Sequence, residues 1–253
     1  MKYPYSLEWE TNRIFHFLEE KNIKATFFWL GSDAERNSLL VRELNDYGHE
    51  IAVHSFSHLK IGKTNKMNFK INTEKAVKTI EDILGKKVKS YRAPNFSLTG
   101  KNIWALEILK ELGIERDCST AIGRSIGNVV LPPAPFIIKH NGIAMKEFPA
   151  SSLSILGNEY KYAGSGYFRI TPYKLLYHKM TTAPYLMSYF HPRDFDSLIH
   201  KKIGWNPYLK FKYRIGTQRA FQNLNKLSDE IPWTSVQDAC SIVDWNKAKM
   251  IQI

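Results

Sequence analysis

The chain has 253 residues, of which 43% are hydrophobic and 13% aromatic, so it can bury one sizeable core and does not have the composition of a disordered protein. Its 36 Lys and Arg residues against 24 Asp and Glu residues give a net charge of +12, which favours anionic surroundings without identifying one. The two cysteines, Cys118 and Cys240, lie far apart without a C-x-x-C spacing, which argues against a disulfide scaffold and against a thiolate zinc site.

The start of the sequence, MKYPYSLEWE, has no apolar segment of the kind found in signal peptides. No apolar run approaches the roughly 18 residues needed to span a bilayer. We therefore expect a soluble, cytoplasmic protein. We expect a single domain over residues 1–253, with residues 197–253 as a basic C-terminal extension packed on it.

From residue 8 to about 120, amphipathic stretches alternate with short apolar runs, a pattern typical of βα units and a mainly parallel sheet. The segment IKATFFWLG predicts the first clear strand, and HEIAVH predicts a second strand that ends at His54. Between these strands, residues 32–48 predict one helix, with Ser32 and Glu35 as a capping box.

The same alternation continues along the chain. The segments TEKAVKTIEDILG and GKNIWALEILKELG predict helices that each end at a glycine, and VKSYRAP and IERDCS predict short strands. Arg92 and Asp117, like His54, therefore lie at the carboxyl ends of predicted strands. Ligands bind at this edge in α/β sheets and barrels, so we expect the three side chains on one rim.

Beyond residue 120 the alternation weakens, and YLMSYFHPRDFD predicts a last apolar strand that ends at His191. Residues 197–228 contain no acid and interleave basic with aromatic residues: Lys201, Lys202, Trp205, Tyr208, Lys210, Phe211, Lys212, Tyr213, Arg214, Arg219, Phe221 and Lys226. This segment predicts a C-terminal helix that packs on the barrel with its lysines and arginines in water, because charge runs are usually solvated faces. A polyanion-binding surface is the alternative.

Residues 54–58, HSFSH, place two histidines four positions apart. Two imidazoles at this spacing can bind one cation when the backbone turns tightly after a strand. Ser55 occupies the position of the general-base glutamate in H-E-x-x-H, so a zincin site is excluded. The spacing alone leaves open a metal site and a pair of ordinary polar residues after a buried strand.

The segments ATFFWLG, GHEIAVHSFSH, YRAPNFS and MSYFHPRDFD, in this order, resemble the polysaccharide deacetylases of carbohydrate esterase family four. The later segments GSGYFRITPY and YFHPRDFD resemble its branch associated with exopolysaccharide and exosortase loci. The resemblance covers about residues 8–236 and implies an α/β fold, a distorted (β/α) barrel. It also implies hydrolysis of N-acetyl groups from an N-acetylated sugar of a bacterial polysaccharide or its precursor.

The resemblance further implies a role for each matching residue. His54 and His58 would bind a divalent metal ion, for which we expect zinc. Arg92 would orient the carboxylate that serves as general base, and His191 would be the general acid that protonates the leaving amine. Two further positions would contact the glycan substrate: Asp117 and Tyr167.

One motif of this family is absent from the sequence. The family has a strand with two acids, the general base and the third metal ligand, upstream of a segment like EWETNRIFHFLEEKNIKATFF, and no such strand stands there in this chain. Because catalytic zinc usually has three protein ligands, we expect a fold with its first strand missing and a site of low activity. We favour a chain shortened at its start over substitution by Glu8 or Glu10 and over a non-catalytic, glycan-binding descendant.

A nucleic-acid-binding protein is a third functional class, and it has only the net charge behind it. The sequence contains no recognised nucleic-acid module, so we expect no nucleic-acid partner.

Overall fold

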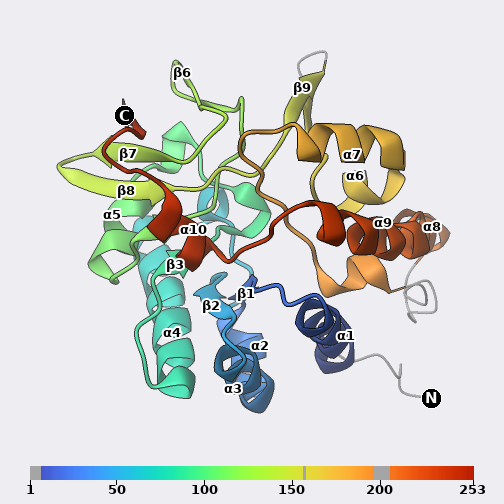
Figure 1. Cartoon of the computed structure of the whole chain (residues 1–253). Coiled ribbons are helices and arrows are strands. Elements are labelled where there is room, and N and C mark those ends of the chain that lie inside the picture. Colours follow the sequence, from blue (N-terminus) through green and yellow to red (C-terminus); the bar gives the residue numbers. More distant parts are fainter. Residues whose placement is uncertain (1–6, 156–157, 197–205) are drawn as a thin grey trace. The chain divides into compact units, whose positions relative to one another are not determined.

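The computed structural model describes residues 7–155, 158–196 and 206–253, and within them the chain forms two compact units (Figure 1). The first unit combines Met1–Ile23 with Ser151–Trp233, and the second combines Lys24–Ala150 with Thr234–Ile253. No helix of the described residues is long and apolar enough to cross a membrane.

The second unit is built on a seven-stranded sheet of order β1-β2-β3-β4-β8-β7-β11. In that order its strands are β1 (Thr26–Trp29), β2 (Glu50–Val53), β3 (Ser90–Tyr91), β4 (Arg116–Asp117), β8 (Ile143–Glu147), β7 (Phe136–His140) and β11 (Lys249–Gln252). Strands β1 to β4 and β8 are parallel, β7 is antiparallel to β8, and β11 is parallel to β7. The predicted α/β class is confirmed, and within the described residues the sheet is open rather than closed into a barrel, with β1 at one edge.

Helices and short 3₁₀ turns connect the strands of this unit: α2 (Gly31–Arg36), α3 (Ser38–Asp46), η1 (Ile61–Lys63), α4 (Lys66–Leu84), η2 (Pro94–Phe96), η3 (Gly100–Asn102), α5 (Ala105–Glu111) and α10 (Val236–Ile242). A two-stranded ribbon of β5 (Ser125–Ile126) and β6 (Val129–Val130) completes it. The long helix α4 buries Phe69, Val77 and Ile80 in the core. It ends at Gly85, whose φ of 68° is left-handed, as the glycine in the sequence predicts.

The single helix predicted for residues 32–48 is wrong, because α2 and α3 are separated by Asn37. The capping box predicted for Ser32 is also absent, since α2 begins at Gly31 and has no side-chain cap. The backbone amides of Gly31 and Ser32 donate instead to the carbonyls of Ser55 (3.0 Å) and Phe56 (3.1 Å). The amides that a cap would satisfy are therefore bonded to the HSFSH loop.

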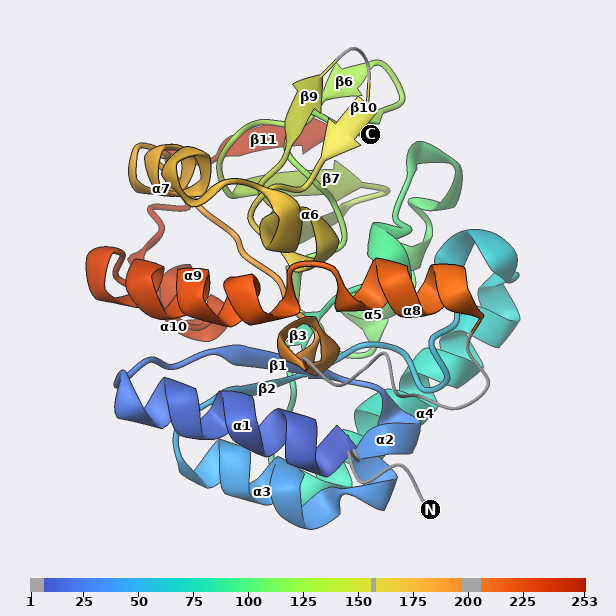
Figure 2. The same ribbon diagram turned by 90° about the vertical axis from the view of Figure 1, so that its right-hand side faces the viewer.

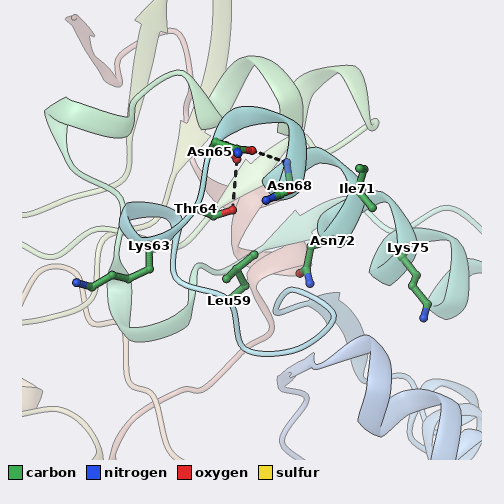
Figure 3. A pocket seen from close by; sticks show the side chains of 8 residues that line it. All are labelled: Leu59, Lys63, Thr64, Asn65, Asn68, Ile71, Asn72 and Lys75. Carbon is green, nitrogen blue, oxygen red and sulfur yellow. Dashed lines mark hydrogen bonds between the residues drawn. The ribbon is translucent and has the colours of Figure 1, made fainter.

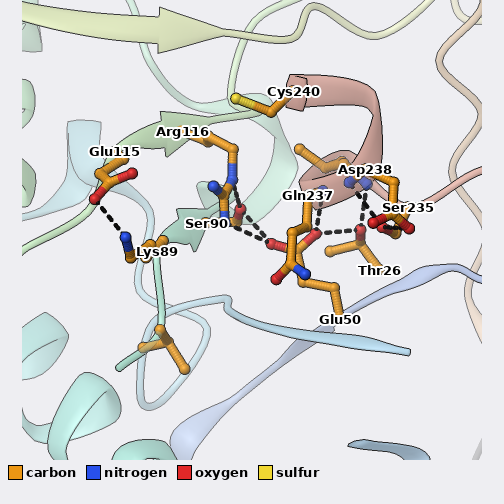
Figure 4. A network of polar contacts seen from close by, with 12 residues as sticks. Thr26, Glu50, Lys89, Ser90, Glu115, Arg116, Ser235, Gln237, Asp238 and Cys240 are labelled. Carbon is orange, nitrogen blue, oxygen red and sulfur yellow. Dashed lines mark hydrogen bonds and ion pairs between the residues drawn. The ribbon is translucent and has the colours of Figure 1, made fainter. Parts of the chain in front are cut away.

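A buried polar network joins the amino ends of the first four strands (Figure 4). The carboxylate of Glu50 accepts hydrogen bonds from Ser90 Oγ (2.6 Å), Arg116 Nη2 (3.1 Å) and Thr26 Oγ1 (2.7 Å). Glu50 Oε2 also accepts a hydrogen bond from the backbone amide of Gln237 at 2.8 Å, which fixes the start of α10 at the amino end of β2. Both oxygens of the Glu50 carboxylate therefore accept hydrogen bonds that tie the strands together. The opposite edge of the sheet, formed by the carboxyl ends of the strands, is where ligands bind in α/β folds.

The first unit contains α1 (Leu7–Glu20), β9 (Leu153–Ile155), β10 (Asn158–Tyr160), α6 (Ser165–Ile170), α7 (Tyr173–Thr181), η4 (Pro192–Phe195), α8 (Pro207–Arg214) and α9 (Thr217–Glu230). Figure 2 shows α8 and α9 following each other end to end. The basic segment thus forms two helices rather than one, and its residues Lys201, Lys202 and Trp205 lie outside the described residues.

The last strand predicted to end at His191 is wrong. Residues 185–191 form a single isolated bridge, between Tyr189 and Gly164, and the chain then enters η4 at Pro192. Residues 185–190 are half-buried rather than buried, and they pair with the loop before α6 instead of with a strand. The prediction was wrong because an apolar segment of this length need not be a buried strand.

Candidate functional site

The HSFSH loop lies directly after β2 and brings its two histidines together. The ring centroids of His54 and His58 are 5.3 Å apart, with the ring planes at 71°. Ser55 and His58 both adopt left-handed backbone conformations, with φ of 64° and 60°. Non-glycine residues seldom adopt this conformation, so two in one short loop give the tight turn that convergence of the imidazoles requires.

Helices on either side hold this loop in place. The backbone amide of Phe56 donates to Asn72 Oδ1 on α4 at 2.9 Å, and Asn72 Nδ2 donates to Ser57 Oγ at 2.9 Å. A Cβ added at Gly31 would lie 2.5 Å from Phe56 Cδ2 and 2.9 Å from Ala76 Cα. Only glycine allows α2, α4 and the loop to approach so closely.

A backbone carbonyl orients the ring of His54. Its Nδ1 lies 2.7 Å from the carbonyl oxygen of Arg92. A carbonyl only accepts hydrogen bonds, so we assign the imidazole proton to Nδ1 and the lone pair to Nε2. Metal-binding histidines commonly have this arrangement, which fixes the ring and the tautomer.

The donor set fits a metal ion only in part. Two neutral imidazoles suit zinc and similar divalent ions. The described residues contain no group of three or more His, Cys, Asp and Glu side chains that could hold a metal. The His54 and His58 pair would therefore supply two of the three protein ligands that a catalytic zinc usually has.

Arg92 lies at the carboxyl end of β3, next to the histidine loop, as the sequence predicts. Its Nε donates to the carbonyl oxygen of Cys118 at 3.3 Å, and its guanidinium carbon lies 4.1 Å from the centroid of the Phe28 ring. The guanidinium group of Arg92 is thus held by contacts with β1 and with the residue that follows β4. Next along the chain, Asn95 and Phe96 both have left-handed φ values, 59° and 52°.

Asp117 ends β4 and is completely buried. Ser119 Oγ donates to Asp117 Oδ1 at 2.5 Å and accepts from the backbone amide of Ala93 at 2.7 Å. Asp117 therefore braces the loop that follows Arg92. It exposes no surface at the rim where the sequence analysis places it, and its contact with a substrate stays a prediction.

Glu147, a residue that the sequence analysis did not single out, lies opposite Asp117 in the register of β4 and β8 and is also completely buried. Its Oε1 accepts from the amide (2.9 Å) and hydroxyl (2.6 Å) of Thr120, whereas Glu147 Oε2 and Asp117 Oδ2 have no donor. Two carboxylates cannot hydrogen bond to each other, but an acid and a carboxylate can. We therefore expect the pair to hold one proton between them.

The ionisation of this acid pair follows from its burial. Burial raises the pKa of Asp117 to about 6, against the opposing effect of its hydrogen bonds to Glu147 and Ser119. Burial, followed by the charge of Asp117, raises the pKa of Glu147 well above its ordinary value. One signal in the sequence could have revealed Glu147, because Met145 and Glu147 fall on the same, buried face of a strand with period two.

In the first unit, His191 lies immediately before η4 and contacts a buried acid. Its backbone amide donates to Asp194 Oδ2 at 2.8 Å, and its Nδ1 lies 3.4 Å from the same oxygen. Arg169 Nε is 3.6 Å from Asp194 Oδ1. Burial opposes ionisation of Asp194, yet the hydrogen bonds and charge of His191, with the charge of Arg169, lower its pKa. The contact between His191 and Asp194 could have been predicted from the sequence, because the two residues are three positions apart at a turn that starts with a proline.

Tyr167 lies on α6 of the same unit, is 38% exposed, and packs edge-on against Tyr160 with ring centroids 5.3 Å apart. The predicted site residues thus fall into two sets. Those of the first unit are His191 and Tyr167. Those of the second unit are His54, His58, Arg92 and Asp117.

The histidine loop lies in a part of the chain that matches a known protein family. Residues 6–116 match the model of the polysaccharide deacetylase family. This part of the chain is similar to polysaccharide deacetylases. Residues 120–241 match a second model, described as a domain of unknown function.

A curated protein similar to part of the chain is a deacetylase. A peptidoglycan-N-acetylglucosamine deacetylase of Bacillus cereus is 31% identical over 98 residues, which are 38% of this chain and 36% of that protein. The alignment thus spans about a third of that relative's length.

Two solved structures share the fold over nearly the whole chain. A candidate polysaccharide deacetylase from Mycobacterium smegmatis has a TM-score of 0.66 at 16% identity, covering 96% of this chain and 80% of its own. A pseudoenzyme of the same esterase family, from Bacillus anthracis, has a TM-score of 0.53 at 12% identity, covering 97% and 63%. The predicted fold type is therefore confirmed.

Proposed function

We propose that the protein hydrolyses N-acetyl groups from an N-acetylated sugar of a bacterial polysaccharide or its precursor, in the exopolysaccharide-associated branch of the family. The observation that carries the proposal is the convergence of His54 and His58 behind β2, with the His54 ring oriented by the carbonyl of Arg92. This geometry lies within the residues that match the polysaccharide deacetylase model.

Each residue has a distinct part in this proposal. His54 and His58 hold a divalent ion, zinc by the chemistry of the donors, and the bound ion supplies polarisation of the acetamide carbonyl. Arg92 would orient a carboxylate that takes a proton from water, the group that belongs to the acidic strand absent from this sequence. His191, held by buried Asp194, gives a proton to the leaving nitrogen. Asp117 and Tyr167 contact the glycan substrate in this proposal.

A cytoplasmic location agrees with the cysteines, because Cys118 and Cys240 are both unpaired thiols. Unpaired cysteines are common where the compartment keeps thiols reduced.

A non-catalytic glycan-binding protein is the second candidate. It is favoured by the incomplete ligand set among the described residues, which offers two histidines and no third metal-binding side chain beside them. A pseudoenzyme also shares this fold. Loss of a positioned general base typically lowers turnover by a factor on the order of 10²–10⁴, so we expect slow hydrolysis from the 253-residue chain.

Acetate release from chitin hexaose with added zinc tests the function. We expect slow but measurable release from the wild-type chain and none above background from His54→Ala or His58→Ala. His178→Ala, which removes an exposed histidine of α7, is the matched control and should behave as wild type. Release that is unchanged in both loop variants would contradict the proposal. Glycan binding with no release from any variant would establish the second candidate.

A further inference from the structure

A groove of about 840 Å³ lies between helix α4 and the loop that follows the histidines (Figure 3). Helix α4 contributes four residues at helical spacing: Asn68, Ile71, Asn72 and Lys75. The loop contributes Leu59, which is adjacent to His58, and Lys63. The groove therefore begins next to the second histidine of the proposed metal site.

The lining combines amide groups and cations and contains no acid. None of the 8 lining residues is Asp or Glu, whereas two are lysines. Figure 3 shows Lys63 and Lys75 at opposite ends of the groove, with the amides of Asn68 and Asn72 between them. An anionic ligand thus meets attraction at both ends and no nearby repulsion from the lining.

The amide and apolar residues match the chemistry of a sugar. An asparagine amide both donates and accepts hydrogen bonds, as a sugar hydroxyl or an N-acetyl group does. Ile71 is 57% exposed, and with Leu59 it offers an apolar surface against which the CH face of a pyranose ring can pack.

The groove is anchored to the histidine loop by two contacts. Asn72 bonds to the amide of Phe56 and to Ser57 Oγ, both at 2.9 Å, within the HSFSH segment. Lys75 Nζ lies 3.8 Å from the centroid of the Phe56 ring, a cation–π contact that fixes its ammonium group beside the HSFSH loop. Two of the lining residues are thus fixed relative to the histidines before any ligand binds, which lowers the entropy cost of binding.

We propose that this groove binds the part of a glycan strand that extends past the acetylated sugar, and that the glycan carries negative charge. This inference rests on the proposed function, because the groove is linked to the histidine pair, and it specifies the substrate class as an acidic, N-acetylated polysaccharide. Lys63 and Lys75 recognise the carboxylate or phosphate groups, and Asn68 and Asn72 recognise hydroxyl and acetamide groups.

Two matched probes test the inference by calorimetry with the full chain. The acidic probe is a hyaluronan hexasaccharide, in which N-acetylglucosamine alternates with glucuronate, and the neutral probe is chitin hexaose. We expect the acidic probe to bind at least about 5-fold more tightly at low salt, with the preference shrinking as ionic strength rises. Lys63→Gln with Lys75→Gln should remove the preference and leave binding of the neutral probe within about 2-fold.

The control is Lys78→Gln with Lys86→Gln, which removes the same charge from exposed lysines on and just after α4 that do not line the groove. An equal loss in this control would assign the preference to net charge and overturn the inference. Equal affinity for the two probes, or no binding of either, would overturn it as well. Because binding is measured separately from acetate release, a preference for the acidic probe without hydrolysis supports the groove and contradicts only the proposed activity.

Discussion

At the scale of single residues, the proton that we expect Asp117 and Glu147 to share links the acid pair to stability. In an unfolded chain Asp and Glu have pKa values of about 3.9 and 4.3. In the folded protein the pKa of Asp117 is about 6 and that of Glu147 is well above its ordinary value. The folded state therefore binds more protons than the unfolded state above about pH 4. Stability contributed by these acids is complete at low pH and is lost as pH rises through the folded pKa values.

Replacing Glu147 by Gln should flatten this pH dependence. The Gln amide can donate to Asp117 Oδ2 without a titrating proton, so Asp117 can ionise with a hydrogen-bond partner present. We expect the free energy of unfolding of the wild type, measured by urea titration, to fall between pH 5 and 8.5, by up to about 1.4 kcal/mol per pH unit for each proton released.

The variant should lose clearly less stability over the same range. Glu43→Gln, at an exposed position of α3, is the control and should keep the wild-type slope. Identical slopes for wild type and Glu147→Gln would refute the shared proton.

At the scale of elements, short apolar runs located the strands β2 and β3, which precede the histidine loop and Arg92, whereas the capping signal predicted for Ser32 failed. The strand that ends just before His54 followed from a short apolar run, because a run of this length is typical of a buried strand. The capping box at Ser32 failed because the first amides of α2 donate to backbone carbonyls of the HSFSH loop, a contact that neighbouring sequence does not encode. The hairpin of β7 and β8 was missed, although Asn141 and Gly142 have the left-handed φ values, 45° and 78°, that this pair favours in two-residue turns.

The close approach at Gly31 is a second test of these elements. Gly31→Ala places a Cβ within 3 Å of the Phe56 ring and of the backbone of Ala76, so the histidine loop or α4 must shift. We expect a loss of about 1–3 kcal/mol in the free energy of unfolding, with weaker zinc binding.

Gly62→Ala is the matched control, because its nearest atom would be Asn102 Nδ2 at 3.6 Å, an ordinary contact. A Gly31→Ala protein with wild-type stability and zinc affinity would show that the loop does not depend on this packing.

At the scale of the whole molecule, the sheet is assembled from both family segments. The polysaccharide deacetylase segment, residues 6–116, supplies β1 to β3 and the histidine pair, and the second segment, residues 120–241, supplies β7 and β8 with Glu147. The convergence of the histidine pair could be predicted because both residues lie in one motif. The acid pair could not, because its register joins two residues that are 30 positions apart in sequence, and Asp117 lies outside both matched segments.

The most direct test of the central claim is the zinc content of the purified chain after equilibration with zinc and removal of excess ion. The account predicts stoichiometric zinc in the wild type and in His178→Ala, and loss of that zinc in His54→Ala, in His58→Ala and in the double variant. Circular dichroism would show that the variants remain folded, since the loop is held by Asn72 and by the amides of α2 rather than by the imidazoles. Stoichiometric zinc retained by a folded His54→Ala/His58→Ala protein would contradict the claim.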